Sequence, residues 1–162
     1  MTSYSQSFHY EECNSNSAAQ RDAKRKGFRK MEFFLEIQPP TVTAQEHKVR
    51  VAGGRPRFYD TAKLKNARAQ FETLLAAHRP DIPIEGPVEL SVDWHFFTKT
   101  HKDGEWRTTR PDTDNLQKLL KDCMTRKGFW KDDAQVCVET ISKRWVRQNP
   151  GIRIKVVGIN DQ

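Results

Sequence analysis

The chain has 162 residues, of which 28 are Lys or Arg and 21 are Asp or Glu, so its formal net charge is +7. This length suits one modest domain, and no apolar run approaches the roughly 18 to 20 residues that a membrane-spanning helix needs. The N-terminus lacks the apolar core of a secretory signal, and the three cysteines have no CxxC or Cys/His spacing. These features exclude a membrane-spanning protein, argue against a disulfide framework or a zinc site, and predict a cytoplasmic location.

The basic excess has two explanations: it keeps a protein soluble, and it attracts polyphosphates by releasing their counterions. Residues 1–30 are polar, show no periodicity and end in the cluster RDAKRKGFRK. We interpret them as a disordered basic extension, either a solvated tail or a segment that touches a nucleic-acid backbone. A folded domain is expected over 31–162.

The domain begins with a predicted strand, because Phe33, Leu35 and Ile37 alternate with other residues until Pro39-Pro40. The stretch 41–59 contains Gly53-Gly54 and suits a loop or an open hairpin. Its cations could bind a phosphate backbone or could simply be solvated; they are Lys48, Arg50, Arg55 and Arg57.

A helix is predicted from Asp60 or Thr61 to about Ala77, followed by a strand at 88–97 whose even-numbered positions are mostly apolar. His95 lies on the polar face of this strand, where a surface or hydrogen-bonded role is more common than metal binding. A second helix is expected over 115–127, stopped by Gly128, and strands over 136–146 and 152–157. The order βαβαββ indicates an α+β domain, a mixed β-sheet with helices packed on one side.

The residues that could form a catalytic or metal-binding site lie in RPDTDNLQKLLKDCMTRKGFWKDDAQ, positions 110–135. We expect Asp112 before the second helix and Asp114 as its cap, both on extended backbone, where residues two apart share a face and can converge on one hard cation. Along the helix, Lys118 follows Asp114 on a polar stripe that continues to Asp122. The helix N-terminus also favours an arriving phosphate.

Asp132 and Asp133 precede the next strand, and their mutual repulsion would be relieved by a cation. Together with Asp112 and Asp114 they predict a Mg²⁺ or Mn²⁺ site, with Lys118 beside the phosphate. The same residues also fit a helix cap, an exposed ion pair and a solvated turn. A calcium loop is excluded, because Leu116 occupies a ligand position and the required glycine is absent.

The motifs PDTDNLQKLLKD (111–122) and WKDDAQV (130–136), followed by a Lys-bearing strand and GIRIKV, resemble the RusA-type Holliday-junction resolvases. An upstream QPPTVTAQE and RFYDTAKLKN also resemble that family, so the likeness spans about 32–157. The resemblance implies Asp112, Asp114 and Asp133 as essential metal ligands, Asp132 as a contributor and Lys118 as a catalytic residue. It also implies a homodimer that binds branched DNA and makes paired cuts.

The sequence therefore predicts a bacterial or phage metal-dependent endodeoxyribonuclease that resolves four-way junctions in recombination and repair. The cations expected to contact DNA are Lys118, Lys48, Arg50, Arg55, Arg57 and Lys143. Two alternatives stay open: a non-catalytic protein that binds branched DNA, and a less selective nuclease.

Overall fold

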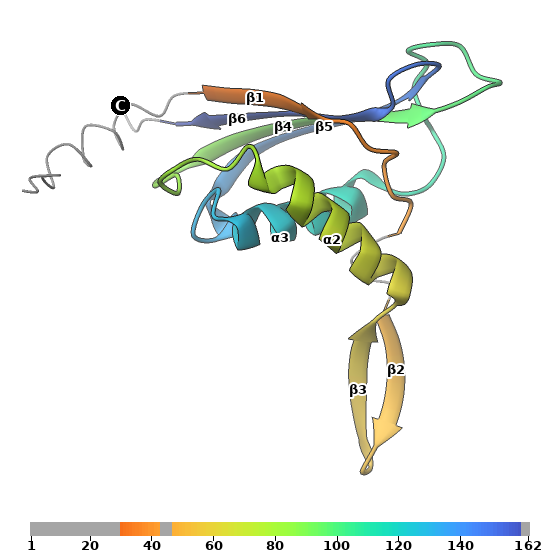
Figure 1. Ribbon diagram of the computed structural model, residues 1–162, viewed down its shortest axis with the longest axis vertical. Coiled ribbons are helices and arrows are strands. Elements are labelled where there is room, and N and C mark those ends of the chain that lie inside the picture. Colours follow the sequence, from red (N-terminus) through yellow and green to blue (C-terminus); the bar gives the residue numbers. More distant parts are fainter. Residues whose placement is uncertain (1–29, 43–46, 160–162) are drawn as a thin grey trace, which may run out of the picture.

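The computed structural model describes residues 30–42 and 47–159, which form a four-stranded mixed sheet, two main helices and a separate hairpin (Figure 1). The order across the sheet is β1 (Lys30–Leu35), β6 (Gly151–Gly158), β4 (Val88–Phe97) and β5 (Val136–Val146). Strand β5 runs parallel to β4, and the other neighbours are antiparallel. The predicted α+β class and mixed sheet are confirmed. The basic extension predicted over 1–30 lies outside the described residues except for Lys30.

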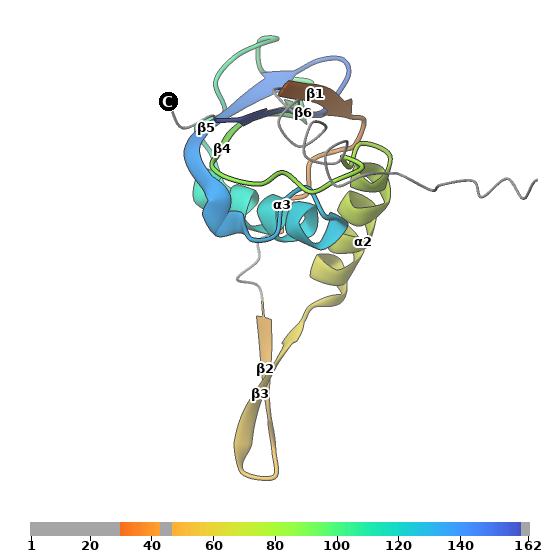
Figure 2. The same ribbon diagram turned by 90° about the vertical axis from the view of Figure 1, so that its left-hand side faces the viewer.

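Helices α2 (Ala62–Ala76) and α3 (Thr113–Lys127) cover one face of the sheet and leave the other open, as Figure 2 shows from the side. Thr61 caps α2 by accepting a hydrogen bond from the Leu64 amide, and Gly128 ends α3 with a φ of 79°. The one-sided packing and both helix C-termini agree with the sequence prediction to within a residue. Neither helix, nor any other in the described ranges, has the length and apolarity needed to cross a membrane.

The core lies between the sheet and the helices, and its pattern follows directly from the alternation in β4. Val88, Leu90, Val92, Trp94 and Phe96 are all buried, and the residues between them are only half-buried. Side chains of successive strand residues point to opposite faces, so this set faces the helices. The apolar residues of α3 that the spacing predicted are buried against it: Leu116, Leu119, Leu120 and Cys123.

Strands β2 (His47–Ala52) and β3 (Arg55–Asp60) form a hairpin that extends away from the body of the molecule (Figures 1 and 2). Gly53 and Gly54 make its turn with φ values of 60° and 72°, the left-handed conformation that a two-residue hairpin turn requires. Of the two predicted forms for this segment, the open hairpin is confirmed. The hairpin adds two strands to the predicted order βαβαββ.

Candidate active site

Helix α3 begins at Thr113, with Asp112 as its N-cap residue. The Asp112 carbonyl accepts the first helical hydrogen bond, from Leu116 N at 3.2 Å, but its side chain makes no capping hydrogen bond. The prediction that Asp114 caps a helix starting near Asn115 was therefore wrong. Asp112, Thr113 and Asp114 are all residue types that can cap a helix, so local rules do not decide among them.

The helical position of Asp114 contradicts the extended backbone predicted for both aspartates. Asp112 is extended, with ψ of 152°, but Asp114 already lies in the first helical turn. The shared-face argument requires extended backbone through both residues, so it does not apply here, and the convergence of the two carboxylates stays a prediction. Both carboxylates are exposed, and within the described residues neither has a hydrogen bond or an ion pair.

Lys118 and Asp122 continue the polar stripe of α3 at intervals of four residues, as predicted. Lys118 is exposed and Asp122 is half-buried. In the part of the chain that the structure describes, the Lys118 ammonium pairs with no carboxylate. A free cation one turn after Asp114 is thus available to an anionic ligand at the helix N-terminus, where the unpaired amides and the helix dipole already favour a phosphate.

The backbone that carries Asp112 is held by Lys143 on β5. The Lys143 ammonium donates to the Thr109 carbonyl at 2.7 Å and to the Pro111 carbonyl at 2.7 Å. Partial burial lowers the pKa of Lys143, the positive charge of Arg107 lowers it further, and the negative charge of Asp112 acts in the opposite direction. Sequence assigned Lys143 to DNA binding, and that role stays a prediction. In the structure, two of its three N–H groups are used within the chain.

Arg107 also contacts this backbone segment. Its guanidinium donates to the Arg110 carbonyl and lies between two aromatic rings, 3.9 Å from the Phe96 centroid and 4.4 Å from the Trp145 centroid. Stacking on aromatic rings suits the planar guanidinium. The approach to α3 is therefore fixed at three successive carbonyls, those of residues 109, 110 and 111.

The second pair of aspartates lies in the short helix η1 (Asp133–Gln135) and its cap. The Asp132 carboxylate accepts from the Ala134 amide at 2.8 Å, so it has a structural task, whereas the half-buried Asp133 side chain has no partner among the described residues. The Gln135 side chain accepts from the Lys131 amide at 2.9 Å and the Asp132 amide at 3.3 Å.

Gln135 also ties this turn to the segment before β4, because its amide nitrogen donates to the Ile84 carbonyl at 3.0 Å and the Gly86 carbonyl at 2.9 Å. The sequence analysis gave Gln135 no role. A signal was present, since Asp followed three residues later by Gln is a capping-box pattern. The contacts with residues 84 and 86, about 50 positions away, have no such local signature.

Asp112 and Asp114 lie at the start of α3, and Asp132 and Asp133 lie at η1. Within residues 30–42 and 47–159, no three His, Cys, Asp or Glu side chains are close enough together to hold a metal ion. The donor chemistry nevertheless suits Mg²⁺ or Mn²⁺, which prefer carboxylate oxygens. Asp112, Asp114 and Asp133 keep their oxygens free of protein partners in the described part of the chain.

The other predicted DNA contacts lie on the hairpin. Lys48 and Arg50 belong to β2, and Arg55 and Arg57 to β3. Arg55 follows the turn and is exposed. The hairpin therefore places four basic residues on an arm away from the core, and their contact with DNA stays a prediction.

His95 belongs to a hydrogen-bonded group on the open face of the sheet. Its Nε2 lies 3.0 Å from Asp93 Oδ2, while Ser142 and Arg144 contact the other oxygen of the same carboxylate. Burial raises the pKa of Asp93, but these hydrogen bonds and charges outweigh it and place the pKa below its usual value. The hydrogen-bonded role expected for His95 is confirmed.

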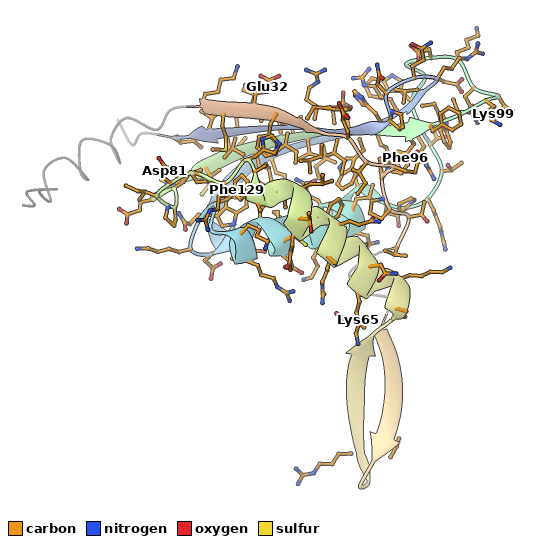
Figure 3. The ribbon with its side chains drawn as sticks, in the orientation of Figure 1. Glu32, Lys65, Asp81, Phe96, Lys99 and Phe129 are labelled. Carbon is orange, nitrogen blue, oxygen red and sulfur yellow. The ribbon has the colours of Figure 1, made fainter. Side chains whose placement is uncertain are left out.

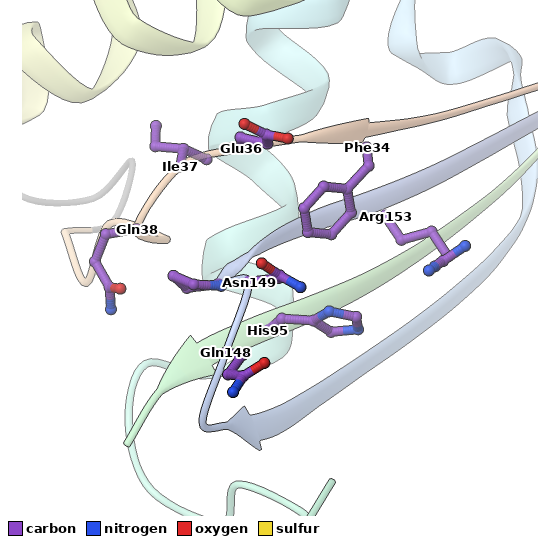
Figure 4. Close-up of a pocket in the computed structure, with 9 residues that line it drawn as sticks. Phe34, Glu36, Ile37, Gln38, His95, Gln148, Asn149 and Arg153 are labelled. Carbon is purple, nitrogen blue, oxygen red and sulfur yellow. The ribbon is translucent and has the colours of Figure 1, made fainter. Parts of the chain in front are cut away.

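A hollow of about 790 Å³ lies beside His95 on this open face, and Figure 4 shows the side chains around it. Its other lining residues are Phe34, Glu36, Ile37, Gln38, Gln148, Asn149, Pro150 and Arg153. The Phe34 ring covers Gly151 so closely that a β-carbon there would lie 2.2 Å from it. None of the predicted site residues lines this hollow.

Comparison with known proteins identifies the family. The family model described as Endodeoxyribonuclease RusA matches residues 38–157. The chain is 31% identical over 108 residues to the crossover junction endodeoxyribonuclease rusA of Lactococcus phage r1t, a match covering 66% of this chain and 82% of that protein. Identities to the proteins of the same name from Enterobacteria phage 82 and Escherichia coli (strain K12) are 26% and 29%, each covering 67% of this chain and 82% of the relative. The chain belongs to the RusA endodeoxyribonuclease family, as its motifs predicted.

Proposed function

We propose that this protein is a metal-dependent endodeoxyribonuclease that resolves four-way DNA junctions by hydrolysing phosphodiester bonds, in recombination and repair. The observation that carries the proposal is the start of α3, where the exposed side chains of Asp112, Asp114 and Lys118 form no hydrogen bond or ion pair in the described chain and lie inside the family match. The relatives that match are named crossover junction endodeoxyribonucleases.

Asp112, Asp114 and Asp133 would hold Mg²⁺, or Mn²⁺ as a substitute, with Asp132 contributing. When bound, the ion would supply Lewis-acid stabilisation of the phosphate and activation of water. Support for this role comes from the oxygen donors and from the lack of protein partners for three of them within the described ranges.

The chain itself would contribute charge and orientation. Lys118 would stabilise negative charge on the phosphate undergoing hydrolysis, next to the amides at the start of α3. Lys143 and Gln135 would fix the two backbone segments that carry the aspartates. Cations on the hairpin would bind the DNA backbone, which supplies affinity that does not depend on base sequence.

A homodimer would match the approximate twofold symmetry of a four-way junction, with one cut made by each protomer. Light scattering during gel filtration would measure its mass. A monomer at the concentration that cleaves junctions would contradict this part of the proposal.

The central experiment compares cleavage of an end-labelled four-way junction with that of a linear duplex of the same sequence, in Mg²⁺, Mn²⁺ or EDTA. Wild-type protein should cut the junction at symmetric positions only with metal. Asp114→Asn should bind the junction and fail to cut it, whereas Glu36→Gln, a change at an exposed carboxylate after β1 that forms no ion pair among the described residues, should cut normally.

Each alternative function gives a different result in this assay. Equal cutting of the duplex would indicate a less selective nuclease. Junction binding without any cutting would indicate a non-catalytic binding protein. Undiminished cutting by Asp114→Asn would contradict the metal role of that residue.

A further inference from the structure

The segment between β4 and α3, residues 98–111, is an ordered strip along the sheet edge. Gly104 N donates to Trp145 O at 2.8 Å, Trp145 N donates to Glu105 O at 2.8 Å, and Arg107 N donates to Lys143 O at 3.0 Å. These bonds pair the strip with the C-terminal half of β5. Its middle part therefore has a fixed position relative to the sheet.

Trp106 stands out on this strip because 59% of its surface is exposed, whereas Trp94 and Trp130 are buried and Trp145 is half-buried. The Arg144 guanidinium lies 4.0 Å from the centroid of the Trp106 ring system, and Arg144 is in turn paired with Asp93 at 3.2 Å. An indole is a large apolar group to leave in water. Trp106 is thus held in place with much of its ring surface open to a ligand.

The strip that carries Trp106 is also rich in exposed cations. Lys99, Lys102 and Arg110 are exposed, and none of their side chains forms an ion pair in the described chain, although the Lys102 amide and then its positive charge help to lower the pKa of Glu105. Figure 3 shows Lys99 on the part of the strip that extends past the end of the sheet.

The two acids of the strip are already engaged. Asp103 accepts from the Arg147 amide at 2.8 Å, and Glu105 accepts from the Lys102 amide at 2.9 Å and lies 3.0 Å from His101. An exposed aromatic ring on the same segment as exposed cations is the combination that binds unpaired bases without reading their sequence.

The position of Trp106 connects this surface with the candidate active site. Only six positions separate it from Asp112, and the backbone between them is held by Arg107 and Lys143. A base that stacks on Trp106 would therefore lie at a fixed place relative to the carboxylates at the start of α3.

We propose that Trp106 stacks on an unpaired or easily unpaired nucleobase at the branch point of a DNA junction, while Lys99, Lys102 and Arg110 contact the neighbouring phosphates. This inference rests on the proposed function for its substrate class and adds the element that would recognise the branch. Bases at a branch point lack part of the stacking of a continuous duplex, so their exposure costs less there. Trp106 would thereby favour junctions over duplexes.

The test measures binding in EDTA, so that it does not depend on cleavage. A four-way junction with 2-aminopurine at the branch point is compared with a linear duplex that carries 2-aminopurine in the same sequence. The proteins are wild type, Trp106→Phe, which keeps an aromatic ring, and Trp106→Leu, which keeps apolar bulk only. Melting temperatures establish that the variants are folded.

Trp106→Leu should weaken junction binding by about 10- to 100-fold, the range expected for loss of one stacked base, and Trp106→Phe should recover most of it. Duplex binding should stay close to wild type in both variants. Wild type should quench the branch-point 2-aminopurine, and Trp106→Leu should not.

The inference is overturned if Trp106→Leu binds the junction as tightly as wild type, if it weakens junction and duplex equally, or if wild type does not prefer the junction. Cleavage by wild type in Mg²⁺ is measured separately. Ring-dependent junction binding without cleavage would refute the proposed function and leave this inference standing.

Discussion

Replacing Lys143 by methionine removes the group that holds the approach to α3. Methionine keeps a long apolar side chain, but it has no donor for the carbonyls of Thr109 and Pro111, each now 2.7 Å from the ammonium. These carbonyls flank Arg110, directly before Asp112. The substitution therefore tests whether Lys143 positions the first of the proposed metal ligands.

The expected loss in the free energy of unfolding follows from the two hydrogen bonds that Lys143 makes. A hydrogen bond from a charged donor contributes about 1.5–3 kcal/mol, but water can partly replace Lys143 because the site is only half-buried. We expect a loss of about 2 kcal/mol in the free energy of unfolding. For a chain of this size that corresponds to a melting temperature lower by about 4–8 °C. Junction cleavage should fall by about 100-fold, the cost of misplacing a reacting group by 1 Å.

The assay combines thermal unfolding, junction cleavage and junction binding, with Lys155→Met as the control. Lys155 is a half-buried lysine on β6 with no hydrogen bond or ion pair among the described residues. If Lys143→Met melts within about 1 °C of wild type and cleaves normally, the positioning argument is wrong. If binding falls while stability and kcat are unchanged, Lys143 acts in DNA binding, as the sequence analysis predicted.

Four further changes test other parts of the structure. Gln135→Leu should lower the free energy of unfolding by about 2 kcal/mol and reduce cleavage, measured by urea titration and the junction assay, because its bonds join two segments. Asp93→Asn should cost more stability at pH 7 than at pH 3, since a carboxyl with a lowered pKa stabilises the fold above its unfolded-state pKa and loses that effect as pH falls; equal costs at both pH values would contradict this. A maleimide should modify exposed Cys137 in the native protein and spare Cys123, because burial raises the pKa of the Cys123 thiol to about 12. Peptide mass spectrometry would identify the modified cysteine, and modification of Cys123 in the native protein would contradict this prediction. Asp114→Asn should lose cleavage while melting no more than about 4 °C below wild type, because this exposed carboxylate makes no hydrogen bond or ion pair in the described fold and contributes only about 0.3–1 kcal/mol through its charge in the first turn of α3; a markedly lower temperature would reveal a further structural role.

The sequence predicted best where a local pattern has one physical solution. The alternation at 88–97 allowed only a half-buried strand, and the structure has β4 at those residues. Gly128 ended α3 as expected, because its left-handed conformation suits glycine. The start of α3 was misplaced, since several residues there can cap a helix and the choice depends on how the preceding backbone is held.

Tertiary contacts account for what the sequence could not predict. The Lys143 bonds join positions more than 30 residues apart, and the Gln135 bonds join positions about 50 apart. Local periodicity carries no information about such pairs. The exposure of Trp106 was missed for the same reason: the sequence shows a tryptophan in a polar segment, and only the pairing of that segment with β5 shows that the ring stays outside.

In the candidate site, the residues that hold the backbone are different from the proposed metal ligands. Lys143 and Gln135 make their contacts with backbone carbonyls and amides, so both aspartate-bearing segments are held without using Asp112, Asp114 or Asp133. Unpaired carboxylates add little to stability, and repulsion among them opposes their approach. A cation that binds them would remove that repulsion, so ion binding should tighten the site and raise the melting temperature. Thus the carboxylates of Asp112, Asp114 and Asp133 remain available for a metal ion, because Lys143 on β5 and Gln135 in η1 make the hydrogen bonds that hold the backbone.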